Sequence, residues 1–301
     1  MAGWRVALAG VLWLSGALAL AQDRVCPDGA DIDASRIAVA GGSITEVIYL
    51  LGEDARLVAA DRTSNYPEAA LALPSIGYVR ALSAEGVLSV DPTLVLGEHD
   101  MGPPEVVEQL QRTKVDVLKF PETFTAQGVI DKVNCVASLL RLRDEQVAQA
   151  TLALQAEAAA LKQVQPDSSL KVALLLGLRE GTPVAAGGDT SGNGLLAMAG
   201  LTNVFEDLSG WKPVSLEAMA SAGPDVLVVP ARGVEQAGGV DALLDHPALR
   251  LTPVAKTRRV IAMDGMRMLG FGPRTIGAAT ELAQRTGTLP DDAGPSEPAA
   301  Q

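Results

Sequence analysis

Few side chains of this sequence could coordinate a metal or form a catalytic dyad, because it holds only two cysteines and two histidines. That supply excludes a zinc ribbon and an all-cysteine iron–sulfur site. A secreted hydrolase finds little support, since neither a G-x-S-x-G elbow nor an H-E-x-x-H motif occurs. We therefore expect a binding protein rather than an enzyme, and any bound metal needs ligands of another type.

The two histidines are predicted to lie in different surroundings. His99 follows the apolar run 94–97, and the carboxyl end of a strand is where ligands tend to bind in α/β proteins. The sequence leaves open whether His99 faces such a ligand or the solvent. His246, which precedes Pro247, is predicted to lie exposed at the end of a helix.

Short apolar runs alternate with helical segments along both halves of the chain, which is typical of repeated βα units. The polar loop 61–67, which follows the second apolar run, carries Tyr66 near its end, and aromatic residues in loops usually bind or cap. We predict strands at 36–40, 57–60, 94–97, 115–120, 171–176, 226–229 and 259–263. We predict helices at 45–51, 103–110, 194–199 and 273–285.

A long helical segment separates the two halves. Residues 125–164 contain no proline and are rich in Ala, Leu, Gln and Glu, and the polar stretch 141–145 divides them. The second part is on the order of 30 Å long at about 1.5 Å per residue, enough to join two lobes. We therefore predict an amino-terminal α/β lobe over 22–143, an interlobe helix over 144–165 and a carboxyl-terminal α/β lobe over 166–288.

An internal repeat indicates that the two lobes are similar. The pattern S-x-E-x3-S-x2-P, followed by an apolar strand, begins at Ser83 and again at Ser215, 132 residues later. Ser and Glu are also common at unrelated helix starts. We interpret the pattern as a duplication because both copies lie between a βα unit and a strand. The predicted fold is therefore α/β, with two Rossmann-like lobes, a central sheet in each, one long rigid helix between them and a ligand cleft between the lobes.

The composition is that of an exported globular protein. With 301 residues, 48% of them hydrophobic, the chain is long enough for two lobes of about 130 residues each. Arg5 and an apolar run ending in Ala19-Leu20-Ala21 predict a cleaved signal peptide over 1–21. That run falls short of the roughly 20 residues that span a bilayer, so we expect no stable membrane insertion. Residues 289–301 are predicted to form a disordered tail.

The net charge limits the classes of binding partner, and the cysteines allow a disulfide. Twenty-four Lys and Arg against 36 Asp and Glu give a net charge of −12 without a basic run, so no nucleic-acid partner is expected. We expect a monomer. In an oxidising compartment, Cys26 and Cys135 form either a disulfide or two unpaired thiols, and the sequence leaves both open.

Four separated motifs occur in order along the chain. They are Asp61-Arg62-Thr63-Ser64-Asn65-Tyr66-Pro67, Gly77-Tyr78-Val79-Arg80-Ala81-Leu82-Ser83-Ala84-Glu85-Gly86, Gly102-Pro103-Pro104 and Leu269-Gly270-Phe271-Gly272-Pro273-Arg274-Thr275. This set resembles the periplasmic hemin-binding proteins, a branch of the class III substrate-binding proteins of ABC importers. The resemblance covers nearly all of the chain after residue 21. It implies a periplasmic protein that captures ferric heme and delivers it to an inner-membrane ABC permease dimer.

The resemblance also implies a ligand set. Tyr66 occupies the position of the tyrosine that ligates ferric iron in the heme branch, and a phenolate is a hard anionic donor that suits Fe(III). A phenol has a pKa of about 10, which iron or a nearby cation must lower. Arginines suit this role and also bind propionates through two hydrogen bonds. The candidates are Arg62, Arg80, Arg232, Arg267 and Arg274, with Arg232 loosely indicated as the phenolate partner.

The sequence departs from part of the heme pattern. Some relatives place a histidine soon after the first strand of the second lobe, but this chain reads Leu176-Gly177-Leu178-Arg179 there. A second axial histidine from that loop, and a stacked heme pair, are therefore in doubt. The alternative ligand within the same fold is cobalamin or a ferric siderophore.

Glu85 and Glu217 occupy equivalent positions in the two copies of the repeat. In the resembled family, such a pair of glutamates meets arginines on the two permease subunits. The alternative is that both are ordinary first-turn glutamates favoured by the helix dipole. We predict that they dock the protein on its permease.

Overall fold

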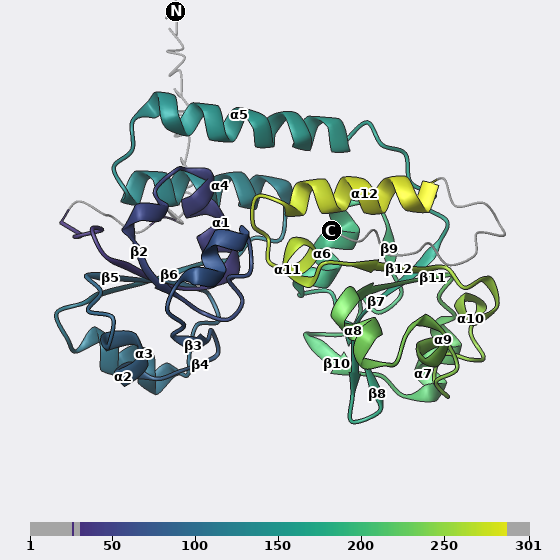
Figure 1. The fold of residues 1–301 in the computed structure, drawn as a ribbon. Coiled ribbons are helices and arrows are strands. Elements are labelled where there is room, and N and C mark those ends of the chain that lie inside the picture. Colours follow the sequence, from purple (N-terminus) through teal and green to yellow (C-terminus); the bar gives the residue numbers. More distant parts are fainter. Residues whose placement is uncertain (1–25, 27–30, 288–301) are drawn as a thin grey trace, which may run out of the picture.

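The computed structural model describes residues 26 and 31–287. Two α/β lobes lie side by side, and the helix α5 (Asp144–Leu161) runs along one side of both (Figure 1). The predicted signal peptide over 1–21 and the predicted tail over 289–301 lie outside the described residues.

The first lobe contains a four-stranded parallel sheet with the order β2-β1-β5-β6. Its strands are β1 (Ile37–Ala40), β2 (Leu57–Ala60), β5 (Leu94–Glu98) and β6 (Asp116–Phe120). A small antiparallel hairpin joins β3 (Gly77–Tyr78) to β4 (Ala81–Leu82). The helices are α1 (Gly42–Leu50), α2 (Ala84–Leu88), α3 (Pro104–Gln111) and α4 (Ala126–Leu139), with short 3-10 turns η1 (Asp54–Arg56) and η2 (Glu68–Ala72).

The second lobe contains a mixed sheet with the order β10-β8-β7-β11-β12, and β9 pairs with β7. Its strands are β7 (Lys171–Arg179), β8 (Thr182–Ala186), β9 (Thr202–Asn203), β10 (Trp211–Pro213), β11 (Val226–Pro230) and β12 (Val260–Met263). Its helices are α6 (Ser191–Met198), α7 (Leu216–Ala222), α8 (Ala231–Gln236), α9 (Val240–Leu244), α10 (Pro253–Thr257), α11 (Gly265–Leu269) and α12 (Thr275–Gly287). The parallel path β9-β7-β11-β12 has the connectivity of β2-β1-β5-β6, as the internal repeat predicts.

The sequence explains why these elements form. The strands β1 and β11 are buried throughout, since helices cover both faces of a parallel sheet and every position must be apolar. Side-chain oxygens cap the amino ends of five of the described helices by accepting a backbone N–H, which satisfies a donor that has no intrahelical partner; one of them is Asp264, at the start of α11. The other four capping residues are Ser83, Thr125, Thr190 and Ser215.

Several predicted boundaries were wrong. The first helix begins at Gly42 rather than residue 45, and the final helix covers Thr275–Gly287 rather than 273–285. The strand predicted at 171–176 extends to Arg179, where it turns into the unpredicted antiparallel strands β8 and β10. The interlobe helix begins at residue 144 as expected but ends at Leu161, before the predicted limit of 165. Pro183 within β8 and the short length of β10 hide these strands from periodicity.

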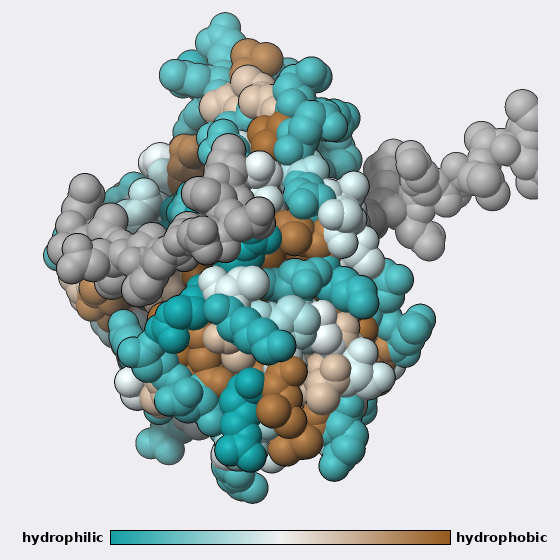
Figure 2. Space-filling view, turned by 90° about the vertical axis from the view of Figure 1, so that its right-hand side faces the viewer, coloured by the Kyte–Doolittle hydropathy of each residue, from teal (hydrophilic) through white to brown (hydrophobic). Residues whose placement is uncertain are grey.

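The helix α5 packs on α4 of the first lobe and α12 of the second (Figure 1). One buried apolar cluster includes residues of both sheets and of these three helices, so the two lobes share part of their core. Within the described residues, no helix is long and apolar enough to cross a bilayer. On the outer face of the second lobe, hydrophobic residues form small groups between hydrophilic ones (Figure 2).

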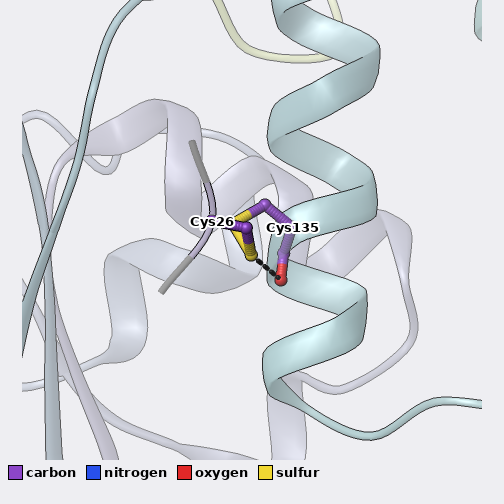
Figure 3. Close-up of a disulfide and its surroundings, with 2 residues drawn as sticks. All are labelled: Cys26 and Cys135. Carbon is purple, nitrogen blue, oxygen red and sulfur yellow. Dashed lines mark hydrogen bonds between the residues drawn. A yellow bond between two sulfur atoms is a disulfide. The ribbon is translucent and has the colours of Figure 1, made fainter. Parts of the chain in front are cut away.

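The two cysteines form a disulfide between the amino-terminal segment and α4 (Figure 3). Cys26 and Cys135 have Cα atoms 5.3 Å apart. This settles the pairing that the sequence left open. The bond fastens the start of the described chain to the first lobe.

Candidate functional site

The loop that carries Tyr66 is organised by one carboxylate. Asp61, which is 3% exposed, follows β2 directly. Its oxygens accept hydrogen bonds from the backbone N–H groups of Gly41 (3.0 Å), Thr63 (3.1 Å) and Val79 (3.0 Å), and from the Thr63 hydroxyl (2.7 Å). Burial raises the pKa of Asp61, and these donors oppose that rise. Asp61 therefore ties the Tyr66 loop to α1 and to the hairpin β3–β4.

Tyr66 lies at the end of this loop with 47% of its surface exposed. Its peptide bond to Pro67 is cis. The guanidinium carbon of Arg274, from the segment between α11 and α12, lies 3.9 Å from the centre of the Tyr66 ring. A tyrosine of the first lobe thus contacts a cation of the second lobe. The electrostatic attraction between the guanidinium and the negative face of the ring stabilises this contact.

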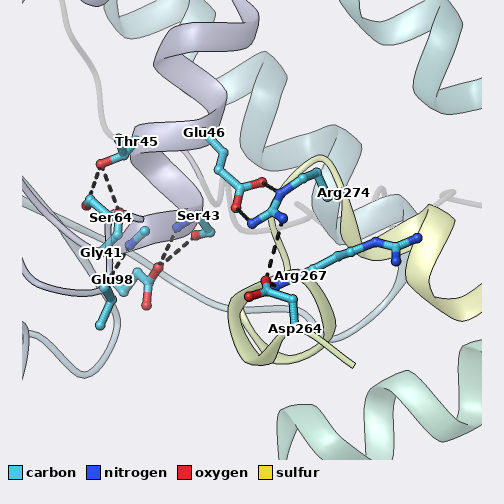
Figure 4. A network of polar contacts seen from close by, with 11 residues as sticks. Gly41, Ser43, Thr45, Glu46, Ser64, Glu98, Asp264, Arg267 and Arg274 are labelled. Atoms are coloured by element: carbon cyan, nitrogen blue, oxygen red, sulfur yellow. Dashed lines mark hydrogen bonds and ion pairs between the residues drawn. The ribbon is translucent and has the colours of Figure 1, made fainter. Parts of the chain in front are cut away.

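Two carboxylates hold Arg274 in this place (Figure 4). Glu46 of α1, only 6% exposed, accepts two hydrogen bonds, from Nη2 at 2.6 Å and from Nε at 3.1 Å. Asp264, the N-cap of α11, lies 3.5 Å from Nη1. Burial raises the pKa of Glu46 while the Arg274 charge lowers it. The guanidinium is therefore fixed by both lobes, and its planar fork matches Glu46 as a bidentate pair.

Two further predicted arginines lie beside the hairpin of the first lobe. The guanidinium carbons of Arg62 and Arg80 lie 5.8 Å and 5.7 Å from the centre of the Tyr78 ring. Arg80 also donates to the Tyr78 hydroxyl and pairs with Asp100. The backbone N–H of Arg62 donates to the carbonyl of Gly77 at 2.8 Å, which joins the Tyr66 loop to the hairpin. Both arginines are exposed, and Arg80 is held by Asp100.

A second polar network lies where α1 meets the carboxyl end of β5. Glu98 accepts hydrogen bonds from Ser43 N–H (3.1 Å) and Ser43 Oγ (2.8 Å). Lys132 Nζ donates to Ser43 Oγ (2.9 Å), to Glu122 Oε2 (2.8 Å) and to the carbonyl of Phe271 (3.1 Å) in the second lobe. Desolvation raises the pKa of Glu98 to about 7, and Lys132 and Ser43 oppose the rise. The Lys132 ammonium therefore pairs with Glu122, reaches Glu98 through the Ser43 hydroxyl, and links the two lobes.

The remaining predicted ligand residues make other contacts. His99 follows β5, is exposed, and lies edge-on to Phe124 with ring centres 6.3 Å apart. Arg232 is exposed in the first turn of α8, directly after the carboxyl end of β11. Arg267 extends away from Glu46 (Figure 4) and pairs with Glu281 of α12 at 2.5 Å. Of the five arginines, only Arg274 contacts Tyr66 in the described structure.

The two predicted docking glutamates lie in matching places. Glu85 is exposed in the first turn of α2, and Glu217 is exposed in the first turn of α7. Both helices lie on the side of the molecule opposite α5, one on each lobe (Figure 1). The other histidine, His246, follows α9 and lies 2.7 Å from the carbonyl of Gly181 through Nε2. It follows the end of a helix as predicted, but its side chain is half-buried where the sequence predicted an exposed one.

Sequence reasoning missed the carboxylates that hold the site: Glu46, Asp61 and Glu98. Two of them carried a signal. Glu46 is the only charged residue of segment 42–50, and Asp61 follows directly on a buried strand. A lone acid in an apolar helix face is costly to bury unless it is paired. Its partner, 228 residues away, could not be identified without the fold.

Two α/β lobes that present polar and charged side chains to each other beside a connecting helix define a two-lobed ligand-binding protein. Residues 37–266 match the family of periplasmic binding proteins. The chain belongs to this family. Membership indicates a location outside the cytoplasm.

Solved structures are similar over most of the chain. The periplasmic heme-binding protein RhuT from Roseiflexus sp. RS-1 is 36% identical with a TM-score of 0.77, covering 83% of this chain and 97% of RhuT. The periplasmic heme-binding protein BhuT, solved with two hemes, is 35% identical with a TM-score of 0.76, covering 84% and 97%. A vitamin B12-binding protein of Photorhabdus laumondii is 27% identical over 83% of this chain and 87% of its own length. The resemblance to periplasmic heme-binding proteins is confirmed.

Proposed function

We propose that this protein is a periplasmic carrier that captures ferric heme and delivers it to an inner-membrane ABC permease. The observation that carries the proposal is Tyr66, an exposed phenol on a loop fixed by Asp61 and faced by the cation Arg274. A phenolate is a hard donor for Fe(III), and a nearby cation favours the anionic form of a phenol. The identity to RhuT and BhuT, both named as heme-binding proteins, supports the same ligand.

The arginines suit the periphery of a heme. Arg62 and Arg80 are exposed on the lobe that carries Tyr66, and a guanidinium binds a propionate through two parallel hydrogen bonds. Arg232 extends this set from the second lobe. Arg267 is paired with Glu281, so a propionate would have to compete for it.

We expect a five-coordinate heme with Tyr66 as the axial ligand. Residues 176–179 contain no histidine and belong to β7. His99 is the alternative sixth ligand, because it is exposed at the carboxyl end of β5. A high-spin absorption spectrum supports the five-coordinate form, whereas a low-spin spectrum that becomes high-spin in His99→Ala assigns His99 as a ligand.

Vitamin B12 is the second candidate ligand, because a curated relative at 27% identity is a vitamin B12-binding protein. Titrating the purified protein with hemin, cobalamin and a ferric siderophore separates the candidates. We expect a new Soret band, saturating at a fixed stoichiometry, with hemin alone. Saturable binding of cobalamin without a hemin spectrum would overturn the heme proposal.

The proposal includes export and delivery. A signal peptide over 1–21 would bring the protein to the periplasm, where the Cys26–Cys135 disulfide can form. Glu85 and Glu217 would each meet an arginine of one permease subunit, since one exposed carboxylate lies on each lobe. Such complementary charges set orientation and association rate more than affinity.

A further inference from the structure

The residue Glu46 has no expected part in binding heme, yet it is built into the site. Its carboxylate is 6% exposed and lies on α1, a largely buried helix in which it is the only charged side chain. Burying a carboxylate is costly unless it is paired and hydrogen-bonded. Its partner is Arg274 of the other lobe, which also stacks on Tyr66.

We propose that Glu46 is a positioning residue for the ligand site: it fixes the Arg274 guanidinium on the face of Tyr66 and so holds this tyrosine in one orientation before the ligand arrives. The expected effect on heme binding rests on the proposed function, whereas the contacts among Glu46, Arg274 and Tyr66 do not. Three atoms fix the guanidinium plane: two Glu46 oxygens, at 2.6 Å and 3.1 Å, and Asp264 Oδ1 at 3.5 Å. With its plane fixed, the guanidinium offers the tyrosine ring one stacking surface.

The backbone beside Glu46 leaves little room for another arrangement. A Cβ atom built on Gly272 would lie 3.1 Å from Glu46 Oε2 and 3.2 Å from Ser43 Cα. The segment before Arg274 therefore fits tightly against α1. Since Arg274 reaches Tyr66 from the second lobe, this contact also couples the orientation of the tyrosine to the packing of the two lobes.

Preorganisation of this kind strengthens binding by reducing the freedom that is lost when the ligand binds. Without Glu46, Arg274 keeps its charge but loses the fork that fixes it, and Tyr66 gains alternative orientations. The effect on ligand binding is therefore indirect and runs through the tyrosine. A change at Glu46 should have no further effect once the Tyr66 hydroxyl is gone.

The first test needs no ligand, because the chain contains only three tyrosines. Ring carbons of labelled tyrosine give separate NMR signals, which Tyr66→Phe assigns. In Glu46→Gln we expect the Tyr66 signals to shift most, while those of Tyr78 stay in place. Unchanged Tyr66 signals, or an equal shift of every tyrosine, overturn the positioning role. If Glu46→Gln does not fold, Arg274→Lys makes the same test, because it keeps the charge and loses the fork.

A matched control breaks a similar ion pair elsewhere. Glu281→Gln removes the partner of Arg267, in a pair of similar length that does not contact Tyr66. We expect the Tyr66 signals of this variant to match those of the wild type. A Tyr66 shift as large as that of Glu46→Gln would mean that the loss of any such ion pair moves the ring, and it would overturn the proposal.

The second test measures hemin binding. We expect Glu46→Gln to weaken it roughly three- to tenfold and to alter the charge-transfer band, and the same substitution in the Tyr66→Phe background to leave the residual affinity unchanged. Equal losses in both backgrounds overturn the role through Tyr66. A wild-type protein that does not bind hemin refutes the proposed function, whereas the ligand-free NMR test still decides the role of Glu46.

Discussion

The two lobes share one sheet topology but differ at the carboxyl ends of their strands. The path β2-β1-β5-β6 and the path β9-β7-β11-β12 have the same order and the same parallel pairing. In each lobe a capped helix, α2 or α7, precedes the central strand β5 or β11 and presents one glutamate. The shared part therefore holds the fold and the predicted docking positions, and the proposed ligand-binding residue Tyr66 lies where the lobes differ.

The two lobes differ most clearly in the segments that follow their edge strands, β2 and β9. Asp61 follows β2 and fixes a loop that ends in the exposed Tyr66. Asn203 ends β9, is equally buried, and its side chain bonds to the carbonyl of Ala186 (2.9 Å) and to the N–H of Phe205 (3.0 Å), a residue that is buried. Each lobe thus uses a buried polar side chain to fix the chain after its edge strand. Only the first lobe uses it to present an aromatic side chain at the surface.

The largest expected effect tests the shared part. Reversing both Glu85 and Glu217 to Arg should abolish heme delivery to a reconstituted permease. The hemin affinity and the free energy of unfolding should stay close to those of the wild type. Both side chains are exposed, and neither forms an ion pair within the described residues. Transport assays in proteoliposomes provide the measurement. The single reversals form the matched comparison, and normal transport by the double variant would leave these glutamates with only a helix-dipole role.

The disulfide distinguishes the first lobe from the second. It joins residues 109 positions apart, and replacing both Cys26 and Cys135 by Ser should lower the free energy of unfolding by about 2–4 kcal/mol. Denaturant unfolding of the oxidised wild type and the variant measures the loss. A variant as stable as the wild type would show that the bond contributes nothing to the first lobe.

Glycines at the starts of α1 and α6 offer a matched pair of substitutions. A Cβ atom at Gly42 would lie 2.4 Å from the carbonyl oxygen of Thr63, whereas one at Gly192 would lie 2.6 Å from the Ala186 Cβ. Overpacking of this kind costs about 1–3 kcal/mol. We expect both alanine variants to be destabilised, but only Gly42→Ala to bind hemin more weakly, because it moves the Tyr66 loop. Equal hemin affinities in the two variants would contradict this distinction.

The smallest expected effect is the pH dependence of the first-lobe network. The pKa of Glu98 is about 7 in the folded protein against 4.5 ordinarily, so the folded state binds this proton more tightly and the free energy of unfolding falls as pH rises from about 4.5 to 7. The whole shift corresponds to about 3 kcal/mol, but Glu98 is only half-buried and solvent screens its charge, so Glu98→Gln should remove about 1–2 kcal/mol of that fall. Denaturant titrations at several pH values measure it, with Glu105→Gln on the surface as the control. An unchanged pH slope in Glu98→Gln would show that this carboxyl does not titrate in that range.

The sequence predicted the fold better than it predicted the site. Strand 57–60 was predicted with its observed bounds, and the βα order followed from apolar runs that only buried parallel strands require. The strand β8 was missed because Pro183 and three alanine or valine residues carry no alternating pattern. Tyr66 and Arg274 could be singled out from their motifs. Their contact, and the role of Glu46 in it, depend on residues more than 200 positions apart, which no local pattern records.

The central claim is that the first lobe supplies the iron ligand, and the absorption spectrum of the hemin complex tests it most directly. Tyr66→Phe removes only the hydroxyl, and Tyr78→Phe makes the same change at a tyrosine that contacts Arg62 and Arg80 instead of Arg274. We expect the Soret and charge-transfer bands of the wild type to change in Tyr66→Phe and to persist in Tyr78→Phe. A hemin spectrum that is the same in Tyr66→Phe as in the wild type would contradict the claim.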